Sequence, residues 1–329
     1  MKLFDTSSAN GVQHPFSVIV GKEISDHIRS WRFIILAAII LLTCFGALYT
    51  SLSNISKVVI KPNDPEDAFF FLKLFTASDG TLPSFLIFIS FLGPLLGISL
   101  GFDAINTEHN RGTLSRVLAQ PVHRDYLINA KFVAALTVIS VMFFALGFLV
   151  VGFGLIAIGI PPTAEEFLRI VFFILLSICY VAFWLNLAIL FSVQFRQAAT
   201  SALACIAVWL FFSVFYNMIV SLVAKSIAPP EMAMVSENRV VAFQNFILKL
   251  MRVAPSQLFS DASTTLLMPN VRTLGFYTTE QVQGAIPSPL PLGQSLLIVW
   301  SQLTALVAGT VVWFGLSYLS FMRREIRSR

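Results

Sequence analysis

Six long runs of apolar residues constrain the fold of this chain more than any other feature of its sequence. They cover residues 33–52, 82–104, 132–158, 170–193, 200–223 and 296–321. A helix rises about 1.5 Å per residue, so about 20 apolar residues cross a bilayer core of about 30 Å. Only 12% of the 329 residues are charged, about half of the roughly 25% typical of soluble domains. The sequence therefore predicts an all-α integral membrane protein with six transmembrane helices.

The lysines and arginines predict which side of the membrane each loop faces. They are densest before the first run, between the second and third, between the fourth and fifth, and after the sixth. Cytoplasmic loops carry an excess of basic residues. We therefore expect a multi-pass protein of the cell membrane with both termini in the cytoplasm. Among the residues that place these segments inside are Lys22, Arg29, Arg32, Arg111, Arg116, Arg124, Arg196, Arg323 and Arg324.

The segment before the first run has the pattern of an amphipathic helix. Its apolar residues Phe16, Val20, Ile24, Ile28 and Trp31 fall on one stripe, which predicts a helix lying in the plane of the membrane interface. The charged residues fall elsewhere on that helix, and they include Lys22, Glu23 and Arg29. Residues 1–32 are thus a cytoplasmic tail and an interfacial helix, and the pattern alone leaves open whether it binds a partner or only the lipid.

A six-helix domain is expected over residues 33–321, followed by a basic cytoplasmic tail at 322–329. Its longest extracytoplasmic segment, residues 224–294, has helical patterns of its own. Phe243, Ile247 and Leu250 lie on one stripe, and Pro255 can begin a second short helix. The fold expected is six spans with short extracytoplasmic helices before the last one.

Small residues recur on one face of the second run. Gly93, Gly97 and Gly101 are spaced by four, a spacing that lets two helix backbones approach closely in a membrane. Packing within the chain is favoured, and a dimer surface or a transport pathway is the alternative.

Polar residues are rare in the spans. Asn186, Asn217 and Gln302 are the clearest, and each is expected to make an interhelical hydrogen bond sooner than to contact a substrate. No run has an Asp, Glu, Lys, Arg or His at its centre. Ion-driven carriers use such groups at mid-membrane, so this pattern speaks against a carrier of that kind.

One polar stretch between the second and third runs, residues 105–124, stands out from the other loops. Glu108 and Arg111 precede Gly112, which permits a turn with positive φ. Leu114 and Leu118 then lie on one side of a short helix that Pro121 ends. A short surface helix with an apolar side and charged neighbours can dock into another protein, although an ordinary solvated loop is the plainer alternative.

A family resemblance rests on this stretch. The ordered set is similar to the signature of type-2 ABC exporter permeases, and more loosely the chain resembles the permeases grouped with multi-copper-enzyme maturation. The matching residues are Glu108, Gly112, Thr113, Leu114, Leu118, Pro121, Arg124 and Lys131. The resemblance implies that residues 105–124, with Arg111 and Arg116, dock on a separate P-loop ATPase subunit, and that the interfacial helix with Lys22, Glu23 and Arg29 also touches it. It further implies a second permease subunit, identical or homologous.

The sequence contains no pattern for catalysis or cofactor binding. Its Gly21-Lys22 pair is followed by Glu23, where a P-loop needs Ser or Thr for magnesium. ATP and magnesium are therefore expected on the partner ATPase and no cofactor on this chain. The four histidines are scattered, so we predict no metal site, and the basic residues form no nucleic-acid-binding module.

The function expected is a non-catalytic permease subunit that couples ATP hydrolysis on a partner to substrate export. An ion-driven carrier and a non-transporting membrane scaffold are the alternatives.

Overall fold

The computed structural model describes residues 15–57, 69–78, 80, 82–110, 112, 123–159, 161–227, 237–271, 274–275 and 289–323. Within these residues the secondary structure is entirely helical. Six stretches are long and apolar enough to cross a membrane, so the prediction of an all-α protein with six spans is confirmed. They are α2 (Trp31–Lys57), α4 (Phe85–Gly101), α7 (Arg124–Ile158), α8 (Ala164–Gln194), the combined α9 (Ala198–Leu210), η2 (Phe211–Phe215) and α10 (Tyr216–Ile227), and α14 (Leu292–Arg323).

Two of these helices begin well before their apolar runs. α7 begins at Arg124, so Lys131 lies on a membrane helix. α8 begins at Ala164, where Thr163 and Glu166 form a capping box, so Arg169 also lies on a membrane helix. The apolar runs are shorter than these helices because backbone hydrogen bonding, and not the polarity of the side chains, sets where a helix begins.

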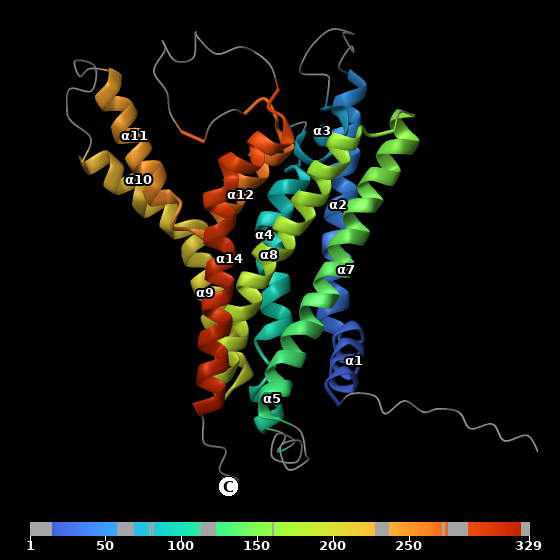
Figure 1. The fold of residues 1–329 in the computed structure, drawn as a ribbon, viewed down its shortest axis with the longest axis vertical. Coiled ribbons are helices and arrows are strands. Elements are labelled where there is room, and N and C mark those ends of the chain that lie inside the picture. The colour runs from blue at the N-terminus through green and yellow to red at the C-terminus, as the bar shows by residue number, and fades with distance from the viewer. Residues whose placement is uncertain are drawn as a thin grey trace, which may run out of the picture.

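The bundle is built around α8, which packs against α4 on one side and α14 on another (Figure 1). Trp184 and Tyr180 of α8 are fully buried. The predicted small-residue face of α4 lies against α8. A Cβ added to Gly97 would be 2.6 Å from the Val181 carbonyl oxygen, and one added to Gly101 would be 2.8 Å from the Ala188 Cβ. Gly93 faces Val181 in the same way. The close packing is therefore within the chain, and α8 occupies the face that a second subunit would need.

The polar residues within the spans differ in what they contact. Asn186 donates a hydrogen bond from Nδ2 to the Thr310 carbonyl oxygen on α14, 3.2 Å away, so the interhelical bond expected of it is present. Gln302 accepts a hydrogen bond from its neighbour Ser301. The Oδ1 atoms of Asn186 and Asn217 are both buried and have no hydrogen-bond partner among the described residues.

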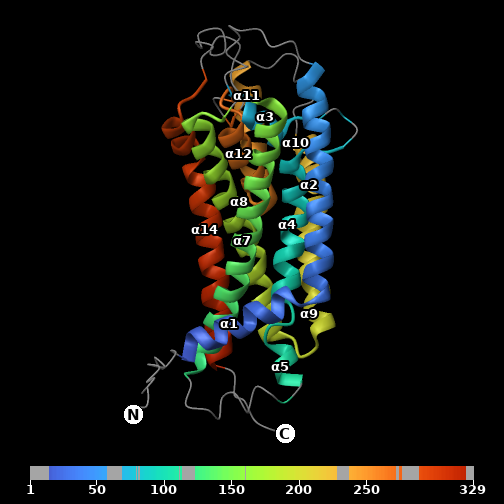
Figure 2. The same ribbon diagram turned by 90° about the vertical axis from the view of Figure 1, so that its right-hand side faces the viewer.

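Short helices lie at both ends of the bundle. α3 (Phe70–Thr76), α11 (Glu237–Met251) and α12 (Pro255–Leu267) lie at one end, here called the α12 end. The two helical patterns predicted before the last span are α11 and α12. At the opposite end, here called the α1 end, α1 (Pro15–Ile28) runs across the bundle and α5 (Asn106–Asn110) follows α4 (Figure 2).

The interfacial helix differs from its prediction in its length and in one charged residue that it buries. α1 ends at Ile28, and Trp31 is the first residue of α2. Ile28 and Trp31 are 51% and 77% exposed, whereas Glu23 is buried. In lipid, apolar side chains gain little by entering the protein, while a carboxylate gains from an internal partner. Glu23 of α1 therefore faces the bundle, whereas the Lys22 and Asp26 side chains beside it are 63% and 62% exposed.

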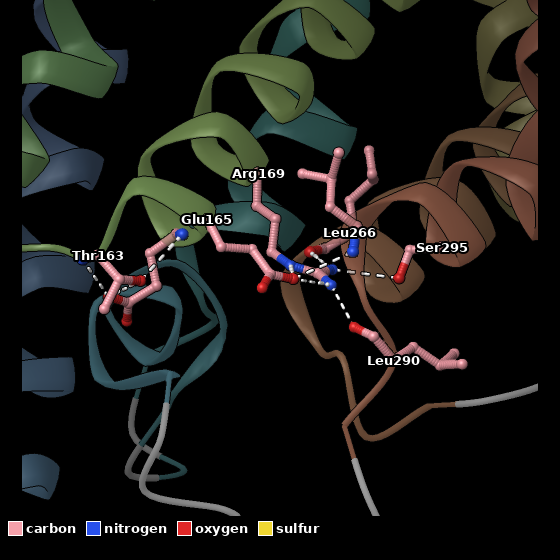
Figure 3. Close-up of polar contacts among 8 residues, drawn as sticks. Thr163, Glu165, Arg169, Leu266, Leu290 and Ser295 are labelled. Atoms are coloured by element: carbon pink, nitrogen blue, oxygen red, sulfur yellow. Dashed lines mark hydrogen bonds and ion pairs between the residues drawn. The ribbon is translucent and has the colours of Figure 1, made fainter.

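One arginine fastens the α12 end together. Arg169 of α8 is fully buried, and its guanidinium pairs with Glu165 at 2.9 Å and donates to the Leu266 carbonyl oxygen at 3.1 Å and to Ser295 Oγ at 3.2 Å (Figure 3). It also donates to the Leu290 carbonyl oxygen. A buried charge is tolerated only when it is paired and hydrogen-bonded. These contacts join α8 to the end of α12 and the start of α14.

Candidate functional site

A buried ion-pair cluster lies at the α1 end, where three helices meet. The Lys131 ammonium of α7 is 2.9 Å from Glu23 Oε2 of α1 and 2.7 Å from Glu108 Oε1 of α5. The Lys131 and Glu23 side chains are 7% and 8% exposed. Lys22 is 3.2 Å from the other oxygen of Glu23. We call Lys22, Glu23, Glu108 and Lys131 the Lys131 cluster.

The charges of this cluster shift the pKa values of the groups on α1. Burial raises the pKa of Glu23, but the charge and hydrogen bond of Lys131 outweigh burial and hold that pKa below its usual value. Burial lowers the pKa of Lys22, and the attraction of Glu23 outweighs it, so this pKa is raised. The pKa of His27 is lowered, first by burial and then by the positive charge of Lys131. Glu23 and Lys22 are thus ionised at neutral pH while His27 is uncharged.

The cluster lines a polar cavity of about 550 Å³ between α1, α4, α5 and α7. A second ion pair borders it, because the Arg32 guanidinium lies 2.6 Å from Asp103 Oδ2. The same guanidinium lies 4.9 Å from the centre of the Phe102 ring, which adds a cation–π contact. In the described part of the chain, no three His, Cys, Asp or Glu side chains are grouped so that they could hold a metal ion.

α5 is also tied to the centre of the bundle. Ser192 Oγ of α8 accepts hydrogen bonds from the backbone N–H groups of Ile105, at 2.8 Å, and Asn106, at 3.2 Å. Asn110 Nδ2 donates to the Arg196 carbonyl oxygen in the turn between α8 and α9, at 2.9 Å. A displacement of α5 would therefore be transmitted directly to α1, α7, α8 and that turn.

The structure brings together some of the predicted site residues and not others. Lys22, Glu23 and Glu108 meet in the Lys131 cluster. Gly112 has the positive φ expected of it, 67°, and Arg124 is the first residue of α7. Arg29 is exposed in the connection between α1 and α2 and does not join the cluster. The other predicted coupling residues lie outside the described residues, namely Arg111, Thr113, Leu114, Arg116, Leu118 and Pro121.

Sequence reasoning missed the partners that complete this site. Lys131 entered only as the last residue of the family signature, and the pairing of Arg32 with Asp103 was not anticipated. One signal was available. Lys131 lies directly before an apolar run and Asp103 within the end of another, and a charge at such a position needs a partner or the headgroup region. The identity of each partner depends on segments that are far apart in the chain.

Comparison with known proteins agrees with this architecture. A curated protein, the probable ABC transporter permease protein NosY of Stutzerimonas stutzeri, is 26% identical over 151 residues. That match covers 44% of this chain and 52% of NosY, so the chain spans about half the length of this relative. The sequence family described as "ABC-2 family transporter protein" matches residues 17–326, which includes all six spans, most of α1 and the polar stretch after α4. This multi-pass membrane protein, a membrane subunit of an ABC transporter, therefore belongs to the ABC-2 transporter family.

Proposed function

We propose that this subunit couples ATP hydrolysis on a separate P-loop ATPase to the export of a substrate. In this proposal the chain is non-catalytic, binds no nucleotide, and works beside a second permease subunit, identical or homologous. The α1 end faces the cytoplasm of a cell membrane and carries both termini. The density of lysine and arginine in the segments at this end supports that orientation.

The Lys131 cluster is the observation that supports the proposal most directly. It joins α5, which begins the polar stretch 105–124, to both α1 and α7 through charges that are almost completely buried. A buried, hydrogen-bonded ion pair has a well-defined geometry. α1, α5 and the start of α7 therefore move together when a partner pushes on the stretch.

The hydrogen bonds of α5 give this movement a path into the spans. Ser192 fastens the turn after α4 to the end of α8, and α8 is the helix around which the bundle packs. A partner ATPase that closes on ATP would thus tilt α7 and α8 together as rigid bodies. Tilting of packed helices is a common form of domain movement in switching proteins.

The test uses two glycines with matched backbones. Gly112 and Gly159 have φ values of 67° and 78°, and a Cβ on either would touch nothing within 4 Å. A valine at either position costs about 1–3 kcal/mol of backbone strain. Gly112 lies in the proposed docking stretch, whereas Gly159 ends α7 at the other end of the bundle.

The measurement is ATP hydrolysis by the complex of this subunit and its co-purified ATPase in lipid nanodiscs. We expect Gly112→Val to lower the permease-dependent ATPase rate several-fold and Gly159→Val to leave it near the wild-type rate. Equal rates for wild type and Gly112→Val would refute coupling through this stretch. Failure of any P-loop ATPase to co-purify would refute the partnership itself.

A further inference from the structure

A second cavity, of about 250 Å³, lies between α4, η2, α10 and α12. Its polar lining consists of Ser90, Ser213, Asn217, Ser256, Gln257 and Ser260, and its apolar wall includes Ile87 and Phe91 of α4. Ser90, Ser213 and Asn217 come from spans, where polar side chains are uncommon in this chain, and the other three come from α12. Six polar side chains therefore converge on one cavity.

Three polar atoms around this cavity have no hydrogen-bond partner in the part of the chain that the structure describes. Ser213 Oγ, Asn217 Oδ1 and Ser256 Oγ are buried and make no hydrogen bond with any described residue. They come from η2, α10 and α12, respectively. Leaving a buried polar atom unsatisfied is costly, and native proteins satisfy the great majority. Three such atoms around one cavity indicate a surface made to hydrogen-bond something that enters it.

Of the residues that the structure describes, none with a charged side chain lines the cavity. The nearest carboxylate along α12, Asp261, is already engaged: Arg252 Nε lies 2.8 Å from Oδ2, and Gln257 Nε2 donates to Oδ1 at 2.7 Å. A charged group in the cavity would lose its hydration without gaining a counter-ion, which is expensive. The lining therefore selects an uncharged ligand with hydroxyl or amide groups.

The wall of the cavity also has an irregular backbone. η2 is a π-helical segment inside the fifth span, and π-helical turns occur frequently at functional sites. Here the segment carries Ser213, and beyond it α10 diverges from the bundle with α11 beside it (Figure 1). The π-helical segment η2 thus separates α10 from α14 at the α12 end, while α12 packs against α4 and η2.

One side of the cavity meets apolar surface. Ile87 and Phe91 are 53% and 49% exposed, although they belong to a membrane span. At about 250 Å³ the cavity is smaller than the roughly 300–1,000 Å³ of a typical small-molecule site, so it takes one end of a larger molecule. The rest of that molecule can lie along the exposed side chains of α4, in contact with lipid.

We infer that this cavity binds the uncharged, hydroxyl- or amide-bearing head of an amphipathic molecule, whose hydrocarbon part lies against Ile87 and Phe91. Ser213, Asn217 and Ser256 supply the hydrogen bonds. The binding of this molecule is inferred from the cavity alone. The further claim that the molecule is the transported substrate rests on the proposed function.

The binding test uses the full chain in nanodiscs, without an ATPase. The probe is an alkyl glucoside with a photoreactive diazirine near its head, and labelled peptides are located by mass spectrometry. We expect labelling of the α4 and α10 segments around the cavity, with displacement by unlabelled alkyl glucoside. Free glucose, an alkyl phosphate and an alkyltrimethylammonium of the same chain length should displace it at least about 10-fold less well. Two results would overturn the inference: labelling of all lipid-facing helices to the same extent, or displacement by the charged amphiphiles as strong as that by alkyl glucoside.

Two serines of α12 provide a matched pair of variants. Ser256 and Ser263 both have a buried hydroxyl without a partner among the described residues, but only Ser256 lines the cavity. Removing either hydroxyl should leave thermal stability equal to the wild type or higher, because an unsatisfied group is lost. We expect Ser256→Ala to weaken labelling about 10-fold and Ser263→Ala to leave it unchanged. Asn217→Leu should weaken it at least as much as Ser256→Ala, and equal effects of the two serine variants would contradict a site.

Coupling is then measured separately on the complex with the ATPase. A change in ATPase rate with alkyl glucoside that is lost in Ser256→Ala would support transport through this site. Labelling without any change in ATPase rate would leave the binding site standing and refute its role in transport. Absence of labelling, together with a lowered ATPase rate in Gly112→Val, would refute the site and leave the proposed function standing.

Discussion

Lys131→Met should detach α1 from the bundle. The ammonium that it removes lies 2.9 Å from Glu23 and 2.7 Å from Glu108 and is 7% exposed. Removing one partner of a buried ion pair costs about 3–5 kcal/mol, because it leaves an uncompensated charge. Lys22 remains 3.2 Å from Glu23, so we expect the lower end, about 3 kcal/mol. At 1.4 kcal/mol per factor of ten, docking of α1 weakens about 150-fold.

Docking can be followed by cross-linking α1 to α7. The Phe16 and Tyr126 rings have centroids 5.7 Å apart, so cysteines at these two positions suit a short bis-maleimide. The native cysteines, Cys44, Cys179 and Cys205, are replaced by alanine. The protein with Lys131 and the Lys131→Met variant both carry the same engineered cysteine pair. The docking free energy lost with the two rings is therefore the same in both. We expect Lys131→Met to lower the initial cross-linking rate more than 10-fold.

A charge-free cluster provides the control. In the triple variant Glu23→Gln, Lys131→Met and Glu108→Gln, no buried charge is left unpaired. Replacing a whole buried ion-pair network is often neutral or stabilising, so cross-linking should recover to near the wild-type rate. Non-additivity of this size is expected among side chains in direct contact. If Lys131→Met cross-links like the wild type, or if the triple variant is no better than the single one, the electrostatic account of this site is wrong.

Three further predictions concern pH, orientation and the α12 end. Acid should weaken the docking of α1 below about pH 6.5, because His27 takes up a proton near its ordinary pKa of 6.5 when α1 is undocked and only at lower pH when α1 is docked. The cross-linking rate should therefore fall in acid, and His27→Gln should remove this pH dependence. Arg29→Cys, exposed beside α1, should react with a membrane-impermeant maleimide only after the cells are opened, and labelling of intact cells would reverse the proposed orientation. Arg169→Met should lower thermal stability by about 3–5 kcal/mol, as for a broken buried pair, and make the end of α12 more susceptible to proteolysis; an unchanged melting temperature would contradict its clamping role.

Hydropathy alone was sufficient for the framework of this protein. The six apolar runs predicted six spans, and the helical stripes after residue 236 predicted α11 and α12. The polar stretch after the second span carried the family resemblance that the match over residues 17–326 confirms. These features can be predicted from the sequence alone, because the transfer of a segment into lipid depends on the composition of about 20 neighbouring residues. It does not depend on which other segment lies beside them.

Tertiary packing decided everything that depends on neighbours distant in sequence. The spacing of Gly93, Gly97 and Gly101 indicated a close contact, but only the folded chain shows that α8 fills it. The amphipathic pattern of α1 indicated an interfacial helix, yet Glu23, one of its charged residues, is buried by an ion pair with Lys131, 108 residues away in sequence. The hydroxyl-lined cavity likewise combines residues of three separate segments. A buried charge or hydroxyl takes its energy from the few atoms within about 3 Å, and the order of residues along the chain does not specify which atoms those are.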